Sequence, residues 1–113
     1  MAKGLSKTQQ ELLNKAHRDI DNARNSQDIV EWYRSIKSGN WIKMMTHDEL
    51  AQKLKEDDED GWYTQSYNEL LSGIVHTQAN GRTLYRLQEL GLIEIIDDQT
   101  HTIMYDTVKI LNY

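Results

Sequence analysis

The hydrophobic positions in the first half of the chain repeat every three or four residues, the spacing of amphipathic helices. Residues 6–24 follow this pattern, and Ser6 stands before it as an N-cap, so we expect a first helix there. A second helix follows and stops at residues 38–40, where Ser, Gly and Asn interrupt the pattern. We expect Trp32 of this helix to lie in the core, and its apolar stripe comprises Ile29, Val30, Trp32, Tyr33 and Ile36.

The next segment combines a short apolar run with a helix start. Residues 41–45 are apolar and bounded by turn residues, which predicts a strand with Trp41 in the core. Thr46 and Glu49 then have the spacing of a capping box, in which two side chains satisfy backbone N–H groups at the first turn of a helix. We expect this helix to end near Lys55.

The second half of the chain predicts two further helices. Residues 65–77 carry helically spaced apolar side chains despite Gly73. The pattern restarts over residues 80–90 and ends at Gly91, which can adopt the left-handed conformation of a helix C-cap. We expect this last helix to face the core with Leu84, Leu87 and Leu90.

The end of the chain has the pattern of β strands. Residues 92–96 and 101–108 are rich in β-forming residues and flank a turn signal at 97–100, which predicts a hairpin. A two-stranded hairpin is marginal alone, so we expect helices beneath it and the strand at 41–45 as a third partner. The predicted fold class is therefore mostly α with a small β-hairpin or three-stranded sheet, an α+β fold in a single domain over residues 1–113.

Composition restricts the class of protein. A chain of 113 residues builds one modest core, and it contains no cysteine for a disulfide or a thiolate metal site. No apolar run approaches the roughly 20 residues that span a bilayer, and the N-terminus lacks the apolar stretch of a signal peptide. We therefore expect a cytoplasmic protein with no membrane partner.

Charge is unevenly distributed along the chain. The net charge is −5, but residues 1–55 carry +3 and residues 56–113 carry −8. The acidic excess comes largely from an uninterrupted run at residues 56–60, Glu-Asp-Asp-Glu-Asp. A nucleic acid would therefore have to meet a local basic surface, because the overall sign does not favour it.

Two segments resemble the bacterial winged helix-turn-helix family. Residues 41–54, Trp-Ile-Lys-Met-Met-Thr-His-Asp-Glu-Leu-Ala-Gln-Lys-Leu, are similar to its strand and first helix. Residues 81–93, Gly-Arg-Thr-Leu-Tyr-Arg-Leu-Gln-Glu-Leu-Gly-Leu-Ile, are similar to the end of its recognition helix and the first wing strand. The resemblance covers roughly residues 27–108 and is closest in style to MarR-like regulators and to plasmid or phage replication and control proteins. It implies a winged-helix core over residues 26–113, with an extra N-terminal helix and an inserted helix.

The resemblance also implies a function. The chain would bind double-stranded DNA in a sequence-specific way, as a repressor or as a replication or mobile-element control protein. Helix 80–90 would enter the major groove, with helix 65–77 left open as the alternative, and its contacts would come from Asn80, Arg82, Thr83, Tyr85 and Arg86. A second set of contacts would come from the capping-box region, with Lys43, Thr46 and His47. We expect a homodimer, with residues 6–24 as the dimer element.

The acidic residues of the predicted wing favour a different partner. Its tip at residues 97–101 carries two aspartates where a phosphate-binding wing would carry Arg or Lys. The alternative function is a winged-helix module that binds a protein through the acidic loop 56–60 and an exposed aromatic pair. The residues of this alternative site are Asp58, Asp60, Trp62 and Tyr63.

No catalytic or metal site is expected. The four histidines are scattered, no serine lies in a nucleophile elbow, and the glycines are too isolated to cradle a phosphate. The acidic run begins like a calcium-binding loop, but Tyr67 stands where that loop needs its bidentate Glu. We therefore expect neither an enzyme nor a cofactor.

Overall fold

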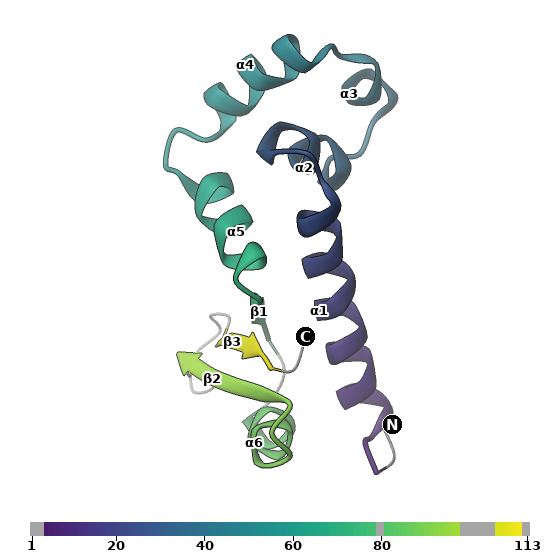
Figure 1. Ribbon diagram of the computed structural model, residues 1–113, viewed down its shortest axis with the longest axis vertical. Coiled ribbons are helices and arrows are strands. Elements are labelled where there is room, and N and C mark those ends of the chain that lie inside the picture. The colour runs from purple at the N-terminus through teal and green to yellow at the C-terminus, as the bar shows by residue number, and fades with distance from the viewer. Residues whose placement is uncertain (1–3, 79–80, 98–105, 112–113) are drawn as a thin grey trace.

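The computed structural model spans residues 1–113, and it describes residues 4–78, 81–97 and 106–111. Within these ranges the chain forms six helices and a three-stranded antiparallel sheet, so the predicted α+β class is confirmed. The molecule is elongated, with principal extents of 46, 30 and 22 Å. At one end lie the sheet and the helix at 81–89, and at the other end lie the helices at 29–36, 40–44 and 47–57 (Figure 1). The helices at 7–25 and 62–71 run between the two ends (Figure 1). Across the described ranges, no helix combines the length and the apolar content that crossing a bilayer requires.

Helix α1, Lys7–Asn25, is the expected first helix. Ser6 and Gln9 form a capping box, because Ser6 Oγ accepts from the Gln9 N–H at 3.2 Å and Gln9 Oε1 accepts from the Ser6 N–H at 2.8 Å. The apolar stripe of α1 packs within the chain, where Ala16 and Ile20 are buried against the sheet end of the molecule. A dimer contact through α1 would therefore have to use its polar outer face.

Helices α2, Ile29–Ile36, and α4, His47–Asp57, build a second and smaller core at the other end. The capping box predicted from Thr46 and Glu49 is present at the start of α4. The buried residues of this cluster are Val30, Tyr33, Ile42, Leu50 and Leu54.

The predicted strand at 41–45 is wrong, because this segment forms the short helix α3, Asn40–Met44. Arg34 accounts for this conformation by satisfying carbonyl groups at the end of the helix. Its Nη1 donates at 3.0, 3.1 and 2.8 Å to the carbonyl oxygens of Ile42, Lys43 and Met45. Trp32 is buried as expected, but Trp41 is 57% exposed, so its placement in the core was wrong.

The predicted helix at 65–77 is wrong at both ends. Helix α5, Trp62–Leu71, begins earlier, and strand β1, Ile74–Thr77, follows it. Gly73 separates the two with a φ of +82°, a left-handed conformation that favours glycine. The Gly73 carbonyl oxygen accepts from the Ile110 N–H at 2.8 Å, which begins the pairing of the new strand.

The three strands form a sheet in the order β1-β3-β2. Strands β2, Ile93–Asp97, and β3, Asp106–Ile110, pair antiparallel, which confirms the predicted pairing of two strands in this region. Strand β3 continues past the predicted end at residue 108, and the segment 98–105 lies outside the described residues. The third strand is β1 instead of the segment at 41–45. The core of this end joins α1 to buried residues of the sheet and of the last helix, namely Val75, Leu84, Leu87, Ile93, Val108 and Ile110.

Helix α6, Gly81–Glu89, corresponds to the expected helix at 80–90. Gly91 ends it with a φ of +75°, and the Gly91 N–H donates to the carbonyl oxygen of Gln88, as expected of a C-cap glycine. Leu84 and Leu87 are buried as expected. Leu90 is 42% exposed, so the expectation that it faces the core was wrong.

Candidate nucleic-acid interface

The outer face of α6 brings together three of the five DNA-contacting residues that were predicted on this helix. Leu84 and Leu87 anchor one side of the helix in the core, which leaves Arg82, Tyr85 and Arg86 exposed to solvent. The two arginines lie one helical turn apart, close enough to contact one ligand together. We call these three exposed residues the α6 face.

Two other residues predicted on this helix do not belong to the α6 face. Thr83 is buried, with 9% of its surface exposed, because it lies on the side of α6 that meets the core. Its placement among the DNA contacts is therefore corrected. Asn80 lies outside the described residues.

Side-chain contacts fix the orientation of α6. Gln88 Oε1 accepts from the backbone N–H of Ile95 at 2.8 Å, which ties the helix to strand β2. Arg86 forms an ion pair with Glu89 at 3.4 Å, and both side chains are more than half exposed. Such a surface pair contributes about 0–1 kcal/mol, so Arg86 can exchange it for another anion at little cost.

The second predicted group of contacts lies at the other end of the molecule. Lys43, Thr46 and His47 belong to α3 and to the start of α4, whereas α6 lies beside the sheet (Figure 1). The structure therefore does not bring the two groups into one footprint. The sequence could not indicate this, because the separation depends on how α1 and α5 span the molecule.

His47 and Thr46 have structural partners where they lie. Thr46 Oγ1 accepts from the Glu49 N–H at 3.2 Å, as a helix cap does. His47 Nε2 lies 3.0 Å from Asp28 Oδ2, which connects α4 to the N-cap of α2. The hydrogen bond with Asp28 raises the pKa of His47. The pKa of Asp28 is lowered, first by the backbone N–H of Glu31 and then by His47.

Several cations at this end of the molecule are also engaged internally. Arg34 binds the carbonyl groups of α3 and pairs with Glu31 at 2.9 Å. Lys53 pairs with Asp57 at 3.6 Å, and its Nζ lies 5.0 Å from the centre of the Trp41 ring. These contacts stabilise the helical cluster and leave less positive charge for a polyanion.

The acidic loop and the aromatic pair of the alternative site serve mainly to begin α5. The Asp58 carboxylate accepts from the Tyr63 N–H at 2.6 Å and from the Thr64 hydroxyl at 2.5 Å, and the Thr64 hydroxyl lowers the pKa of Asp58. Asp60 accepts from the backbone N–H of Trp62 at 3.1 Å. The N-cap of α5 is Gly61, which has no side chain to accept a hydrogen bond, so Asp58 and Asp60 supply these acceptors from positions before the cap, where no N-cap motif in the sequence indicates them.

The aromatic pair separates into one internal and one external residue. The Tyr63 ring packs edge-on against Tyr33 with ring centres 5.1 Å apart, and its hydroxyl accepts from Lys37. Trp62 is 57% exposed and is available to a partner.

The two candidate recognition helices differ in charge. The segment 65–77 is not one helix, and α5, which contains its first part, carries no Lys or Arg, whereas α6 carries Arg82 and Arg86.

The wing tip at 98–101 lies outside the described residues, and Asp97 ends β2 opposite Thr107. Among the described residues, no group of three or more His, Asp or Glu side chains is placed to hold a metal ion.

Comparison with known proteins adds no family assignment. No protein family, curated protein or solved structure matches this chain.

Proposed function

We propose that this chain is a non-enzymatic regulator that binds duplex DNA through the α6 face. The observation that carries the proposal is the contrast between the two sides of α6. Leu84 and Leu87 anchor one side in the core, while Arg82, Tyr85 and Arg86 extend from the other. A helix held in this way can enter a major groove without losing its packing.

The arrangement around α6 supports a winged-helix interpretation of this half of the chain. Helix α5, strand β1, helix α6 and the β2–β3 hairpin follow one another, and the third strand pairs with the hairpin. This order differs from the expected one in having a single helix between the first strand and the wing. We propose a winged-helix unit over residues 62–111, with α6 as its recognition helix.

The side chains of the α6 face suit a nucleic acid. An arginine can donate two hydrogen bonds to a guanine edge, or it can neutralise a phosphate. Tyr85 lies between Arg82 and Arg86 in sequence and is 47% exposed, so a sugar or a base can reach the exposed part of this residue. One short helix buries little surface against DNA, so we propose a homodimer that binds two half-sites. The dimer would act as a repressor or as a replication or mobile-element control protein.

The test is binding of a labelled random-sequence duplex, measured by fluorescence anisotropy over a series of salt concentrations. We expect affinity to fall steeply with salt, because each phosphate contact releases counterions. The double variant Arg82→Glu/Arg86→Glu should lose this binding. The matched control is Lys43→Glu/Lys55→Glu, which changes two exposed lysines at the other end of the molecule and alters the net charge equally.

The control separates a local contact from a general effect of charge. Loss of binding in the α6 variant alone supports the α6 face. An equal loss of DNA binding in both variants would show that only the net charge of the protein matters. A loss of binding in the lysine variant alone would assign the DNA contact to the α3–α4 end. Absence of binding at low salt would overturn the proposal, since non-specific affinity should be strongest there.

A further inference from the structure

The two edges of the sheet present their backbone groups differently. Strands β1 and β2 are the edges, because the order is β1-β3-β2. The Ile110 N–H donates to the Gly73 carbonyl at 2.8 Å, and the Leu111 N–H donates to the Leu92 carbonyl at 3.0 Å. These two bonds determine which residues of β1 and of β2 form hydrogen bonds with β3.

In an antiparallel ladder, every second residue bonds to the neighbouring strand, and the residues between them point their N–H and C=O groups away from it. On β1 the residues that point away from β3 are Ile74 and His76, and on β2 they are Ile93 and Ile95. The contact of the Ile95 N–H with Gln88 Oε1 at 2.8 Å agrees with this assignment.

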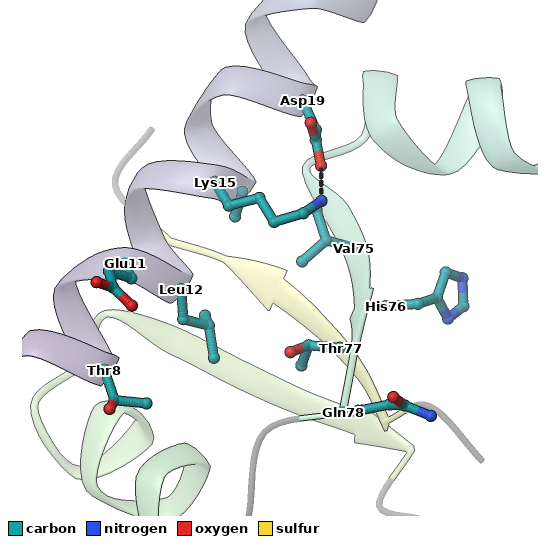
Figure 2. Close-up of a pocket in the computed structure, with 10 residues that line it drawn as sticks. Thr8, Glu11, Leu12, Lys15, Asp19, Val75, His76, Thr77 and Gln78 are labelled. Atoms are coloured by element: carbon teal, nitrogen blue, oxygen red, sulfur yellow. Dashed lines mark hydrogen bonds and ion pairs between the residues drawn. The ribbon is translucent and has the colours of Figure 1, made fainter. Parts of the chain in front are cut away.

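The β2 edge is thus partly covered by α6, whereas the β1 edge opens into a groove. The groove has a volume of about 500 Å³ and lies between α1 and β1 (Figure 2). Four consecutive residues line it on the strand side, Val75 to Gln78. Because side chains on a strand alternate between the two faces of the sheet, a groove lined by consecutive residues lies along the strand edge itself.

An apolar hollow extends this groove toward α5. It has a volume of about 330 Å³ and shares Lys15, Asp19, Val75 and His76 with the groove. Its apolar lining includes Trp32, Ile36, Trp62 and Leu70. Trp62 and Ile36 are 57% and 43% exposed, so the hollow is accessible from solvent.

The charges of the groove wall are unequal. Lys15 Nζ pairs with Asp19 Oδ2 at 2.7 Å, as the dashed line in Figure 2 marks. Glu11 also lines the groove, and its contact with Lys7 is longer, at 3.9 Å, between side chains that are both mostly exposed. The wall therefore carries a negative charge that a basic group could approach.

We propose that this groove binds an extended peptide segment of a partner protein, which adds to β1 as a further strand. The outward backbone groups of Ile74 and His76 match the donors and acceptors of a strand. The hollow beside Trp62 would take an apolar side chain of the peptide, and Glu11 would face a basic one. Residues 74–78 correspond to about five residues of peptide at roughly 3.3 Å each.

The shape of the groove favours a separate peptide over a second copy of this chain. Helix α1 forms one wall of the groove, and a second copy would have to bring its own α1 to the same edge. A single extended strand needs no such accommodation. Unlike the proposed DNA contact, this site uses neither Arg82 nor Arg86, so the two proposals can fail separately.

The experiment uses a displayed library of random peptides selected on the full chain, followed by anisotropy with the selected peptide. The matched variants are His76→Ala and His76→Pro. Both remove the imidazole, which contacts Glu69 and Thr107, but only proline removes the outward N–H. We expect His76→Pro to bind roughly tenfold more weakly than His76→Ala, and Trp62→Ala to lose a similar factor.

Amide hydrogen exchange of the unmodified chain provides a second measurement that does not depend on the folding of the proline variant. With peptide bound, the Ile74 and His76 amides should gain protection, while the Ile95 amide, already bonded to Gln88, should not change. Equal binding by both His76 variants, or no added protection at Ile74 and His76, would overturn the proposal. Failure of the library to yield a binder would also overturn the proposal. A dimer of this chain that dissociates with His76→Pro but not with His76→Ala would overturn it too, because the β1 edge would then bind a second copy of the chain.

Discussion

At the residue scale, His47 is a polar side chain that was predicted to contact DNA but that forms a contact within the fold. The sequence placed it beside a capping box, and that local prediction is confirmed. Its partner Asp28 is 19 residues away and belongs to another helix, so no local pattern could indicate the contact. Asp48 lies near the same ring, at 4.0 Å from Nδ1.

The His47–Asp28 contact predicts a pH dependence of stability. The folded-state pKa of His47 is raised, so its stabilising effect is complete below the usual histidine value of about 6.5 and is lost as pH rises through the folded-state pKa. The pKa of Asp28 is lowered, so its effect is present above about 3.9 and is lost as pH falls through its folded-state pKa. The pair therefore stabilises most between roughly pH 4 and 6.5.

The measurement is an NMR titration of the His47 ring in the unmodified chain and in Asp28→Asn. Asparagine still caps the helix but carries no charge, so the variant isolates the ionic part of the contact. We expect the His47 pKa to fall in the variant. His17, which lies on α1, is the internal control, and a His47 pKa that does not respond to the substitution would contradict the assigned contact.

At the scale of elements, the sequence predicted those whose signals are local. The starts of α1 and α4 follow from their N-caps, Ser6 and Thr46, and the end of α6 follows from Gly91, and each of these signals covers only a few residues. The segment at 41–45 was misassigned because its conformation depends on Arg34, from another helix. Strand β1 was misassigned because its apolar residues also fit a helix, and only pairing with β3 decides between the two.

Helix α5 provides a prediction at this scale. Asp58→Ala removes the carboxylate that binds two backbone N–H groups at the start of the helix, those of Tyr63 and Thr64. We expect a lower Tm, by a few degrees, because an uncapped helix start leaves these donors without a protein acceptor. The measurement is thermal unfolding followed by circular dichroism.

The neighbouring carboxylate Glu59 is the matched control. Glu59→Ala removes the same charge from the same acidic run, on an exposed side chain. Relief of repulsion among the carboxylates should make this control neutral or slightly stabilising. Equal changes in the two variants would assign the effect to the charge of the run and not to the cap.

At the scale of the whole molecule, the candidate surfaces are separated along its long axis. The sequence predicted the α6 face in part, because Leu84 and Leu87 define the side of the helix that is buried. It could not predict that Lys43 lies at the opposite end, nor that a groove follows β1. Both depend on how α1 and α5 connect the two cores, which no local pattern records.

This separation makes Trp41 and Trp62 reporters of two different surfaces. Trp41 lies on α3 near Lys43, Trp62 is exposed and lines the apolar hollow, and Trp32 is buried and lines the same hollow. None belongs to α6 or to the β2–β3 hairpin. The indole N–H signals in an NMR spectrum, assigned with single Trp→Phe variants, therefore distinguish where a ligand binds.

We expect duplex DNA to leave the Trp41 and Trp62 indole signals in place while it shifts backbone amides of α6, because the α6 face lies at the other end of the molecule. A groove-binding peptide should shift Trp62 and leave Trp41 unchanged. A Trp41 shift with DNA would instead assign the contact to the α3–α4 end, where Lys43 and His47 lie, and the α6 proposal would then fail while the groove proposal stands. A peptide that shifts α6 amides but not the Trp62 signal would overturn the groove proposal and leave the α6 proposal standing, because the bound peptide would then lie outside the groove along β1.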